Sequence, residues 1–464
     1  MAKCSPHDGS TLAQVARSGL ADVKTAVAAA QAAQRSWADT PPVQRGLLLH
    51  ALACKLKDNS EEMAAVVARE TGKSLKDAKG EVGAAVQLGL FYASEGQRLY
   101  GRTTTSGVQY KYAMTVRQPI GIAGLIIAAN TPIANIAWKV FPALICGNSA
   151  VLKAAEDTPI TAWYFGRLAR DSGLPAGVLN IIQGLGHEAG SALVEHPAVG
   201  VISFTGSTRV GKIIHEQAGR RLARVSLELG GKNPLVVCDD AELENAVKWT
   251  LLSAFSNAGQ RCAAASRIIV FDGIYDRFRD RLLERTSKLK VGSADSDDFG
   301  PVINERQLEN LLKVIAEAKA AGAKVLAGGY RLTGSDHIGG NYLSPTLLEG
   351  VDPASPLSCT ELFGPIAVLY RVKDFEESLR LANNSPYGLT ACIHTRNFHR
   401  AILFADRVQA GVAVVNAGTF GSEPHMPFGG QKASGNGTRE PGTEAVDVYS
   451  ELKCIYLNID PTAV

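Results

Sequence analysis

The chain has 464 residues, which at ~150 residues per domain predicts about three domain-sized units. Its 48 Lys and Arg residues against 45 Asp and Glu residues leave a formal charge of +3, too weak a field to gather nucleic acid or an anionic membrane. Hydrophobic residues make up 46% and charged residues 20%, a globular mixture that excludes disorder and fibrous repeats.

The first hundred residues are predicted to be mainly helical. Ala, Leu and Val recur at helical spacing in residues 22–37 and 42–58, and residues 61–99 continue this character. Apolar and polar residues then alternate with a period of two from 108 to 116. This alternation predicts a half-buried strand that projects and pairs with another element.

Short apolar strands alternate with helical stretches from residue 120 to residue 238, which predicts a parallel sheet with helices on its faces. The expected strands are GIAGLIIAA, SAVLK, GVLNIIQ, GVISF, RVSLEL and NPLVV. A second alternating region has expected strands near 267–271, 324–327, 366–371, 389–394 and 412–416. We therefore predict an α/β fold class with two sheet-containing units.

Cysteine and histidine are scattered along the chain. The eight cysteines include no CxxC pair, and the nine histidines form no HExxH motif or Cys/His cluster at zinc-ligand spacing. We expect reduced thiols and no metal site. The N-terminus lacks the apolar core of a signal peptide, and the apolar run 120–129 is too short to cross a bilayer. The expected location is the cytoplasm.

The segment FTGSTRVGKI follows one of the predicted strands. Gly206, Gly211 and Lys212 satisfy the GxxxxGK pattern of a phosphate loop, but Ile213 has no hydroxyl to hold magnesium. What remains is a helix N-terminus whose free N–H groups and dipole can hold a pyrophosphate. A plain strand-to-helix turn is the alternative.

Two further segments contain groups suited to catalysis. Glu228 ends an apolar strand before Gly230 and Gly231, so it can point into a cleft where burial raises a carboxyl pKa toward that of a general base. A carboxylate paired with Lys or Arg is the alternative. Cys262 lies among small residues in NAGQRCAAASR, which leave room for a ligand at the sulfur. An inert buried cysteine is the alternative.

In this order the segments resemble the aldehyde dehydrogenase superfamily along nearly the whole chain. The matching segments are PIGIAGLIIAAN, AWKVFPALICGNSAVLK, AAEDTP, FTGSTRVG, LELGGKNP, GQRC, ELFGP, NNSPYGL and PFGGQKASG. The resemblance implies a Rossmann-like cofactor domain (1–101 and 119–229), an α/β catalytic domain (230–440) and a β oligomerisation arm (102–118 and 441–464). It further implies NAD(P)-dependent oxidation of a small-molecule aldehyde by a homodimer or homotetramer.

The resemblance assigns catalytic roles to four residues. Cys262 is the nucleophile that forms a thiohemiacetal and, after hydride transfer to the nicotinamide, a thioester. The side-chain amide of Asn130 and the backbone N–H of Cys262 hold the oxyanion. Glu228 activates the water that hydrolyses the thioester, and Lys139 lies near the site. Without the resemblance, Asn130 reads as a turn or helix-cap residue and Lys139 as a structural lysine.

Cofactor contacts are implied along both predicted units. The positions are Ile126, Lys153, Glu156, Gly206, Ser207, Gly211, Glu361 and Phe363. Lys153 and Glu156 match residues that meet the adenosine ribose, and Glu361 matches the carboxylate on the nicotinamide ribose. A carboxylate at Glu156 accepts hydrogen bonds from a ribose 2′-OH and repels a 2′-phosphate, which favours NAD. Lys153 can screen such a phosphate, so NADP stays possible.

The aldehyde tunnel is implied to be lined by residues from several segments. The positions are Thr131, Trp138, Arg261, Phe420, Ser422, His425 and Phe428. Arg261 and His425 can recognise the carboxylate of a semialdehyde acid, whereas the aromatic residues fit an aromatic or aliphatic chain equally well. Arg261 can instead brace its own loop. Three rival functions stay open. One is a coenzyme A-acylating relative, which generally lacks the base glutamate, another is a non-catalytic NAD-binding protein of the same fold, and the third is a thiol hydrolase that uses Cys262 without a nicotinamide.

Overall fold

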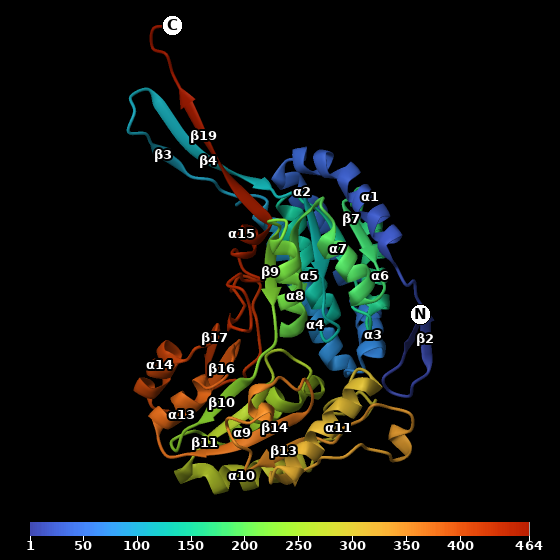
Figure 1. Ribbon diagram of the computed structural model, residues 1–464, viewed down its shortest axis with the longest axis vertical. Helices are drawn as coiled ribbons and strands as arrows, with labels where there is room; N and C mark the ends of the chain where they lie inside the picture. The colour runs from blue at the N-terminus through green and yellow to red at the C-terminus, as the bar shows by residue number, and fades with distance from the viewer. Residues whose placement is uncertain (464) are drawn as a thin grey trace.

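The computed structural model describes residues 1–463 as two sheet-centred halves with a projecting arm (Figure 1). The N-terminal half begins with helices α1 (Leu20–Asp39), α2 (Pro42–Asp58), α3 (Ser60–Thr71) and α4 (Leu75–Glu95). The mainly helical start is thereby confirmed. A hairpin of β1 (Ala2–Cys4) and β2 (Thr11–Gln14) precedes these helices and was not predicted.

A parallel five-stranded sheet forms the centre of the N-terminal half. Its strands, in spatial order, are β7 (Leu179–Ile182), β6 (Ser149–Lys153), β5 (Ile122–Ile126), β8 (Val199–Thr205) and β9 (Arg224–Glu228). The chain moves outward from β5 to β7 and then returns to the other side of β5. This reversal lies between β5 and β8, where open α/β sheets bind ligands beyond their carboxyl ends.

Helices cover both faces of this sheet because its strands are apolar on both sides. On one face, Ala123 and Leu125 of β5 pack with α2, α4, α5 (Pro132–Ile145) and α6 (Pro159–Asp171). On the other face, Ile122 and Ile126 pack with α1, α7 (Ser191–Glu195) and α8 (Thr208–Gly219). A π-helical turn, Gly186–Gly190, precedes α7.

The C-terminal half contains a seven-stranded sheet in which only the β12–β13 pair is antiparallel. Its strands, in spatial order, are β12 (Lys324–Ala327), β13 (Thr346–Glu349), β14 (Ile366–Val372), β11 (Ala265–Phe271), β10 (Asn233–Val237), β16 (Thr390–His394) and β17 (Val412–Val415). The segment NPLVV, grouped above with the first sheet, is β10 of this second sheet, and β13 was not predicted. The other expected strands are present.

Helices and short pairings complete the C-terminal half. They are α9 (Leu243–Phe255), a 3₁₀ turn (Ser256–Gly259), α10 (Asp272–Thr286), α11 (Glu305–Ala320), a second 3₁₀ turn (Ser335–His337), α12 (Pro356–Cys359), α13 (Phe375–Asn383), α14 (Phe398–Arg407) and the pair β15 (Tyr387–Gly388) with β18 (Gln431–Lys432). Two clusters of buried apolar side chains, one on each face of the sheet, join these helices to the strands.

The arm is a three-stranded antiparallel sheet that projects from the N-terminal half, and the C-terminus lies at its tip (Figure 1). Its strands are β3 (Thr103–Thr105), β4 (Lys111–Pro119) and β19 (Ser450–Asn458), the last preceded by α15 (Ala445–Tyr449). The strand expected at 108–116 begins later, since Tyr110 has a φ of +57° and ends a turn. Val464, the last residue assigned to the arm, lies outside the described residues, and the proposed domain limits stay a prediction.

Among residues 1–463, no helix combines the length and apolar character needed to cross a bilayer. The same residues contain no group of three or more His, Cys, Asp and Glu side chains arranged to hold a metal ion. The eight cysteines are all free thiols.

Candidate active site

A cavity of about 380 Å³ lies between the two sheets. The N-terminal half contributes residues at or after the carboxyl ends of β5, β8 and β9, and the C-terminal half contributes residues before β10, β11 and β14. From the expected site the lining includes Asn130, Thr131, Trp138, Gly206, Ser207, Glu228, Cys262, Glu361, Phe363 and Phe428. The fold thus brings together residues up to 298 positions apart in sequence, from Asn130 to Phe428.

Cys262 follows a strained turn that connects α9 to β11. Asn257 and Ala258 have φ values of +52° and +54°, in the left-handed region that side chains with a Cβ disfavour. Gln260 stabilises this turn, since its amide donates to the Asn257 carbonyl at 3.2 Å and its side-chain oxygen accepts the Ile303 N–H at 2.9 Å. Such strain is maintained at functional sites when surrounding contacts over-determine the backbone.

Asn233, at the start of β10, fixes the backbone of the cysteine. Its buried amide donates to the carbonyl oxygens of Cys262 at 2.7 Å and Ala264 at 2.9 Å, and its oxygen accepts the Thr390 N–H at 3.1 Å. Gly231 must be glycine here, because a Cβ would lie 2.5 Å from the carbonyl oxygen of Cys262. The sequence analysis did not single out Asn233.

The Cys262 thiol is protonated at neutral pH. Burial raises the pKa of this thiol to about 12, and the neighbouring carboxyl groups of Glu361 and Glu228 act in the same direction. Formation of a nucleophilic thiolate therefore requires a group that removes the proton.

Glu228, the last residue of β9, is 3% exposed and belongs to the lining of the cavity. Neither carboxyl oxygen has a hydrogen-bond partner, and no Lys or Arg among the described residues forms an ion pair with it. Burial, followed by the neighbouring Glu440, raises its pKa well above the usual range. A buried carboxyl left unpaired is costly, so this one is available to exchange protons with water.

Lys139 does not line the cavity. Its ammonium group is fully buried behind Glu228, 2.9 Å from Glu440 Oε2 and 2.7 Å from Ser203 Oγ. Glu440 also accepts a hydrogen bond from the Tyr449 hydroxyl at 3.0 Å. This arrangement agrees with the structural alternative for Lys139, although its charge acts to lower the pKa of Glu228.

Glu361 enters the cavity from the segment between α12 and β14. Its Oε1 accepts the Gly231 N–H at 3.1 Å, and a Cβ at position 230 would lie 2.2 Å from Oε2, so a side chain there would displace the Glu361 carboxyl group. Burial raises the pKa of Glu361 to about 7, against the opposing effects of the Gly231 N–H and Lys232. Phe363 beside it has a φ of +59°.

The remaining expected cofactor residues divide into two groups. Gly206 and Ser207 line the cavity, and the Ser207 hydroxyl caps α8 by accepting the Val210 N–H at 3.4 Å. Glu156 accepts the Gly186 N–H of the π-helical turn and lies 3.9 Å from Lys153 Nζ. Lys153 is the last residue of β6 and Glu156 follows it, and both lie outside the cavity lining.

Ile126 and Gly211 have packing positions. Ile126 lies in the buried apolar cluster that includes α1, and Gly211 packs against Leu229, where a Cβ would lie 2.5 Å from a methyl group. The structure therefore supports an apolar floor and a close helix–strand approach at these positions, rather than polar contacts.

The cavity fits a dinucleotide by the chemistry of its donors. The free N–H groups at the start of α8 suit a pyrophosphate, and the carboxyl groups of Glu156 and Glu361 suit ribose hydroxyls. In addition, the buried hydroxyl of Thr205 in the lining has no partner within the protein. Of these groups, Thr205 and the start of α8 lie at the switch point of the five-stranded sheet, Glu156 lies beyond the neighbouring strand β6, and Glu361 comes from the C-terminal half.

Of the expected substrate residues, the structure brings Thr131, Trp138 and Phe428 to the cavity. The Trp138 and Phe428 rings lie 5.3 Å apart and form an apolar wall. Arg261 lies beside the cavity, with its guanidinium 5.0 Å from the ring centre of Phe420 and 3.8 Å from Asp77. Ser422 and His425 are exposed and are not brought to the cavity.

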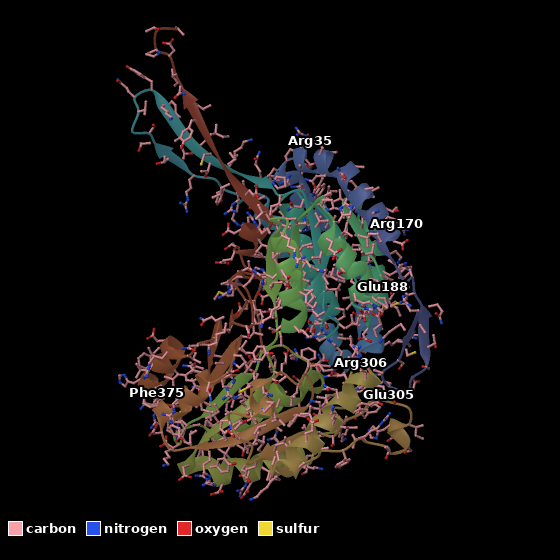
Figure 2. The ribbon with its side chains drawn as sticks, viewed as in Figure 1. Arg35, Arg170, Glu188, Glu305, Arg306 and Phe375 are labelled. Atoms are coloured by element: carbon pink, nitrogen blue, oxygen red, sulfur yellow. The ribbon has the colours of Figure 1, made fainter. Side chains whose placement is uncertain are left out.

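One wall of the cavity was missed in the sequence. It comes from the first turns of α11 and consists of Ile303, Asn304, Arg306, Gln307 and Asn310. Gln307 donates to the carbonyl oxygens of Leu362 at 2.7 Å and Phe363 at 3.2 Å, and so supports the Glu361 segment. Figure 2 shows Glu305 and Arg306 at the end of α11 that meets the N-terminal half. The polar run NERQLEN was the available signal.

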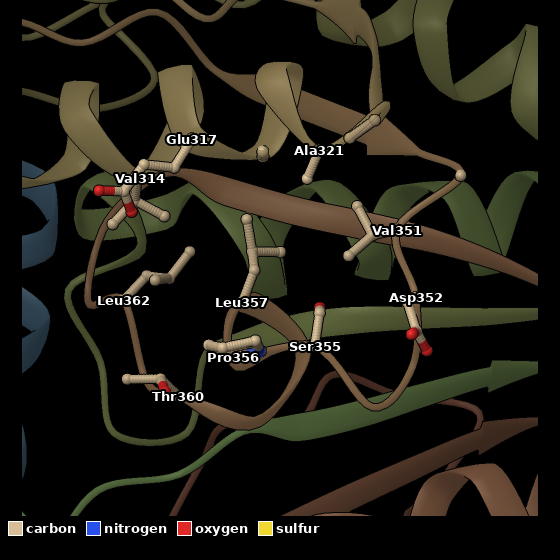
Figure 3. A pocket seen from close by; sticks show the side chains of 13 residues that line it. Val314, Glu317, Ala321, Val351, Asp352, Ser355, Pro356, Leu357, Thr360 and Leu362 are labelled. Carbon is tan, nitrogen blue, oxygen red and sulfur yellow. The ribbon is translucent and has the colours of Figure 1, made fainter.

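A second cavity of about 380 Å³ lies on the outer side of the Glu361 segment, between α11 and α12 (Figure 3). Val314, Val351, Leu357 and Leu362 give it apolar walls, and Leu362 is shared with the first cavity. Its lining contains no thiol and no histidine, and its two acidic side chains, Glu317 and Asp352, lie apart in Figure 3. The cavity with Cys262 is therefore the candidate active site.

Comparisons with known proteins identify the family of the chain. A model of the aldehyde dehydrogenase family matches residues 1–455. The chain is 39% identical to the α-ketoglutaric semialdehyde dehydrogenase of Bacillus subtilis over 94% of this chain and 90% of that protein. It is 36% identical to the NADP⁺ succinate-semialdehyde dehydrogenase of Escherichia coli, over 98% of this chain and 94% of that one.

A solved structure shows the same fold. The betaine aldehyde dehydrogenase of Staphylococcus aureus in complex with NAD⁺ matches with a TM-score of 0.97 and 31% identity, covering 99% of this chain and 92% of that one. The α/β fold class and the resemblance drawn from the sequence segments are thereby confirmed. The chain belongs to the aldehyde dehydrogenase family and is an aldehyde dehydrogenase that uses a nicotinamide cofactor.

Proposed function

We propose that this enzyme oxidises its aldehyde to a carboxylic acid through a thiohemiacetal and a thioester on Cys262, with hydrolysis by a water that Glu228 activates. The observation that carries the proposal is the convergence of a thiol, an unpartnered buried carboxyl group and the Asn130 amide on one cavity. When bound, the nicotinamide cofactor supplies the hydride acceptor.

The first half of the reaction takes place at the sulfur. The Cys262 thiol loses its proton to solvent, and its Sγ bonds to the aldehyde carbon, whose oxygen becomes an oxyanion. The Asn130 amide and the Cys262 N–H donate hydrogen bonds to this oxygen, where negative charge develops. Collapse of the oxyanion re-forms the carbonyl, releases a hydride from the same carbon and leaves a thioester.

The second half requires water. Glu228 accepts a proton from water, the resulting hydroxide oxygen bonds to the thioester carbon, and the C–S bond breaks to release the acid and the Cys262 thiolate. The raised pKa of Glu228 supports this role, because a carboxylate of ordinary pKa is a poor base near neutrality. The balance is aldehyde, NAD⁺ and water in, and carboxylic acid, NADH and a proton out.

NAD is the proposed cofactor, with NADP as the alternative. Glu156 supports this choice, since its carboxylate is anchored by the Gly186 N–H at the carboxyl end of the sheet and would repel a 2′-phosphate. Steady-state assays with both cofactors test it. A higher kcat/KM with NADP than with NAD would overturn the preference.

The hydrolytic outcome is tested with coenzyme A. A panel of succinic and α-ketoglutaric semialdehydes, aliphatic aldehydes and benzaldehydes is assayed with NAD, with and without coenzyme A. We expect NADH formation without coenzyme A and its loss in C262A, with C54A, on α2, as the matched thiol control. Strict dependence on coenzyme A, or an active C262A enzyme, would contradict the proposal.

A carboxylate-bearing aldehyde is the favoured substrate class. The buried Nε of Arg261 has no hydrogen-bond partner, which supports a role in binding an anion beside the cavity. The named semialdehyde dehydrogenases among the relatives agree with this class. In R261M we expect a raised KM for semialdehydes and an unchanged KM for neutral aldehydes. Equal changes for both would contradict it.

The arm supports a homo-oligomer, at least a dimer. Tyr112 of β4 and Leu452, Tyr456 and Leu457 of β19 are each about half exposed or more. Leu452 and Tyr456 lie on one face of the arm, and Leu457 lies on the other face with its register partner Tyr112, so each face has apolar side chains that a second copy can cover. The free state of all eight cysteines supports the reducing cytoplasm as the compartment.

A further inference from the structure

A buried ion pair lies behind Asn130, on the side away from the cavity. Lys73, in the turn between α3 and α4, contacts Glu81 of α4, and both side chains are at most 5% exposed. Lys73 Nζ also donates a hydrogen bond to the backbone carbonyl of Asn130 at 2.7 Å. Neither residue lines the cavity, and neither belongs to the motifs discussed above.

Glu81 uses its other oxygen to hold the start of α5. Its Oε1 accepts the backbone N–H groups of Ile133 at 2.9 Å and Ala134 at 3.2 Å. The N-cap residue of α5, Thr131, makes no side-chain capping bond of its own. A carboxylate from α4 therefore satisfies the free donors at this helix N-terminus and complements its dipole.

The same carbonyl of Asn130 is held from the opposite side. Asn257 Nδ2, in the left-handed turn before Cys262, donates to it at 3.3 Å. The Asn130 backbone is thus fixed by one donor from the N-terminal helices and one from the turn that positions the nucleophile.

We infer that Lys73 and Glu81 are positioning residues that set the Asn130 amide for the oxyanion on the Cys262 adduct. The inference rests on the proposed function, since it assumes that Asn130 holds this oxygen. A buried ion pair is seldom a source of net stability, because desolvation offsets the attraction between the charges. Its use here is geometric: it defines where the β5–α5 loop stops and α5 begins.

The test is a double-mutant cycle between K73M and N130A, measured as kcat and KM with a responsive aldehyde. We expect K73M to lower kcat by about 10- to 100-fold, since a misplacement of about 1 Å can cost that much. The KM for NAD should stay unchanged. In the N130A background, K73M should cause no further loss, because Lys73 acts through Asn130. A merely structural lysine would not produce this non-additivity.

The control is K79M, which removes the exposed ion pair of Lys79 with Glu61 between the same two helices and should leave kcat unchanged. Thermal unfolding and circular dichroism report whether each variant folds. If K73M does not fold, the double variant K73M/E81Q, which removes both charges, takes its place in the cycle.

The outcomes separate this inference from the proposed function. A large loss in N130A with a wild-type kcat in K73M, or the same loss from K73M in both backgrounds, would overturn the inference alone. A wild-type kcat in N130A would overturn the oxyanion assignment and the inference together.

Discussion

The two halves of the molecule supply the active site from opposite ends of their strands. In the N-terminal half, Asn130, Gly206 and Glu228 lie at or beyond the carboxyl ends of parallel strands. In the C-terminal half, Cys262 and Glu361 precede β11 and β14, at the amino ends of those strands. The first arrangement follows the general rule for open α/β sheets. The second depends on specific side chains, such as Asn233, that hold irregular backbone in place.

This difference predicts how substitutions in each half affect activity and stability. A site at the carboxyl end of a parallel sheet is positioned by the strands themselves and by the helix that follows. The turn before Cys262 is not positioned by a regular strand or helix. Its three consecutive residues Asn257–Gly259 have left-handed backbone, which side-chain contacts must hold in place. Substitutions around it should therefore affect both chemistry and stability, whereas those at the carboxyl ends should affect chemistry alone.

The largest loss of activity is expected in the N-terminal half, where the site lies at the carboxyl ends of the strands, from E228Q. Loss of the base should lower kcat by about 100- to 10,000-fold, with the free energy of unfolding not reduced, because Glu228 makes no hydrogen bond that could be lost. A burst of one NADH per active site should remain, since the thioester still forms. E216Q, at the exposed Glu216 of α8, is the matched control. Unchanged turnover without a burst would contradict the account.

The second-largest loss of activity is expected in the C-terminal half, where the site lies at the amino ends of the strands, from N233A. This substitution leaves the carbonyl oxygens of Cys262 and Ala264 and the Thr390 N–H without their partner. We expect a loss of about 3 kcal/mol in the free energy of unfolding and of about 100-fold in kcat. Denaturant unfolding and steady-state kinetics measure the two. N245A, which removes an exposed hydrogen bond to Asn416, should change neither.

A smaller effect, on the KM for NAD, is expected from a change of pH. Burial raises the pKa of Glu361 to about 7, so below pH 7 this carboxyl is protonated and loses the negative charge that favours ribose hydroxyls as donors. The KM for NAD should therefore rise as pH falls below 7 and become constant at higher pH. In E361Q this dependence should disappear. A KM that is flat between pH 6 and 8 in the unchanged enzyme would contradict the assignment.

The smallest effect on catalysis is expected at the arm, which contributes to neither side of the cavity. Replacement of Tyr456 and Leu457 by Asp adds charge to both exposed faces of β19 and should shift the assembly toward monomers, as measured by light scattering. Turnover per subunit should change less than in any variant above. A monomeric unchanged protein would overturn the oligomerisation role.

Much of the fold could be predicted because the parallel strands are short, apolar and separated by helical segments. The strand Lys324–Ala327 was predicted at its observed limits, whereas Thr346–Glu349, of the same length, was not, since it directly follows Pro345. The sheet to which Asn233–Val237 belongs could not be read from order along the chain. It depends on pairing with strands that occur later in the sequence.

The candidate site was predicted where a motif contains the functional group itself, as for Cys262, Glu228 and Asn130. Supporting residues were missed because their partners lie far away in sequence. The position of Lys139 is set by Glu440, 301 residues later, and a sequence motif does not show that pairing. The left-handed backbone of Ala258 could not be predicted either, because alanine disfavours it without tertiary contacts.

The most direct test of the central claim is the intact mass of E228Q after incubation with NAD and a responsive aldehyde. We predict a mass increase equal to one acyl group, which peptide mapping places on Cys262 and which is absent in C262A. An unmodified protein after its NADH burst, or an acyl group on another cysteine, would contradict the account.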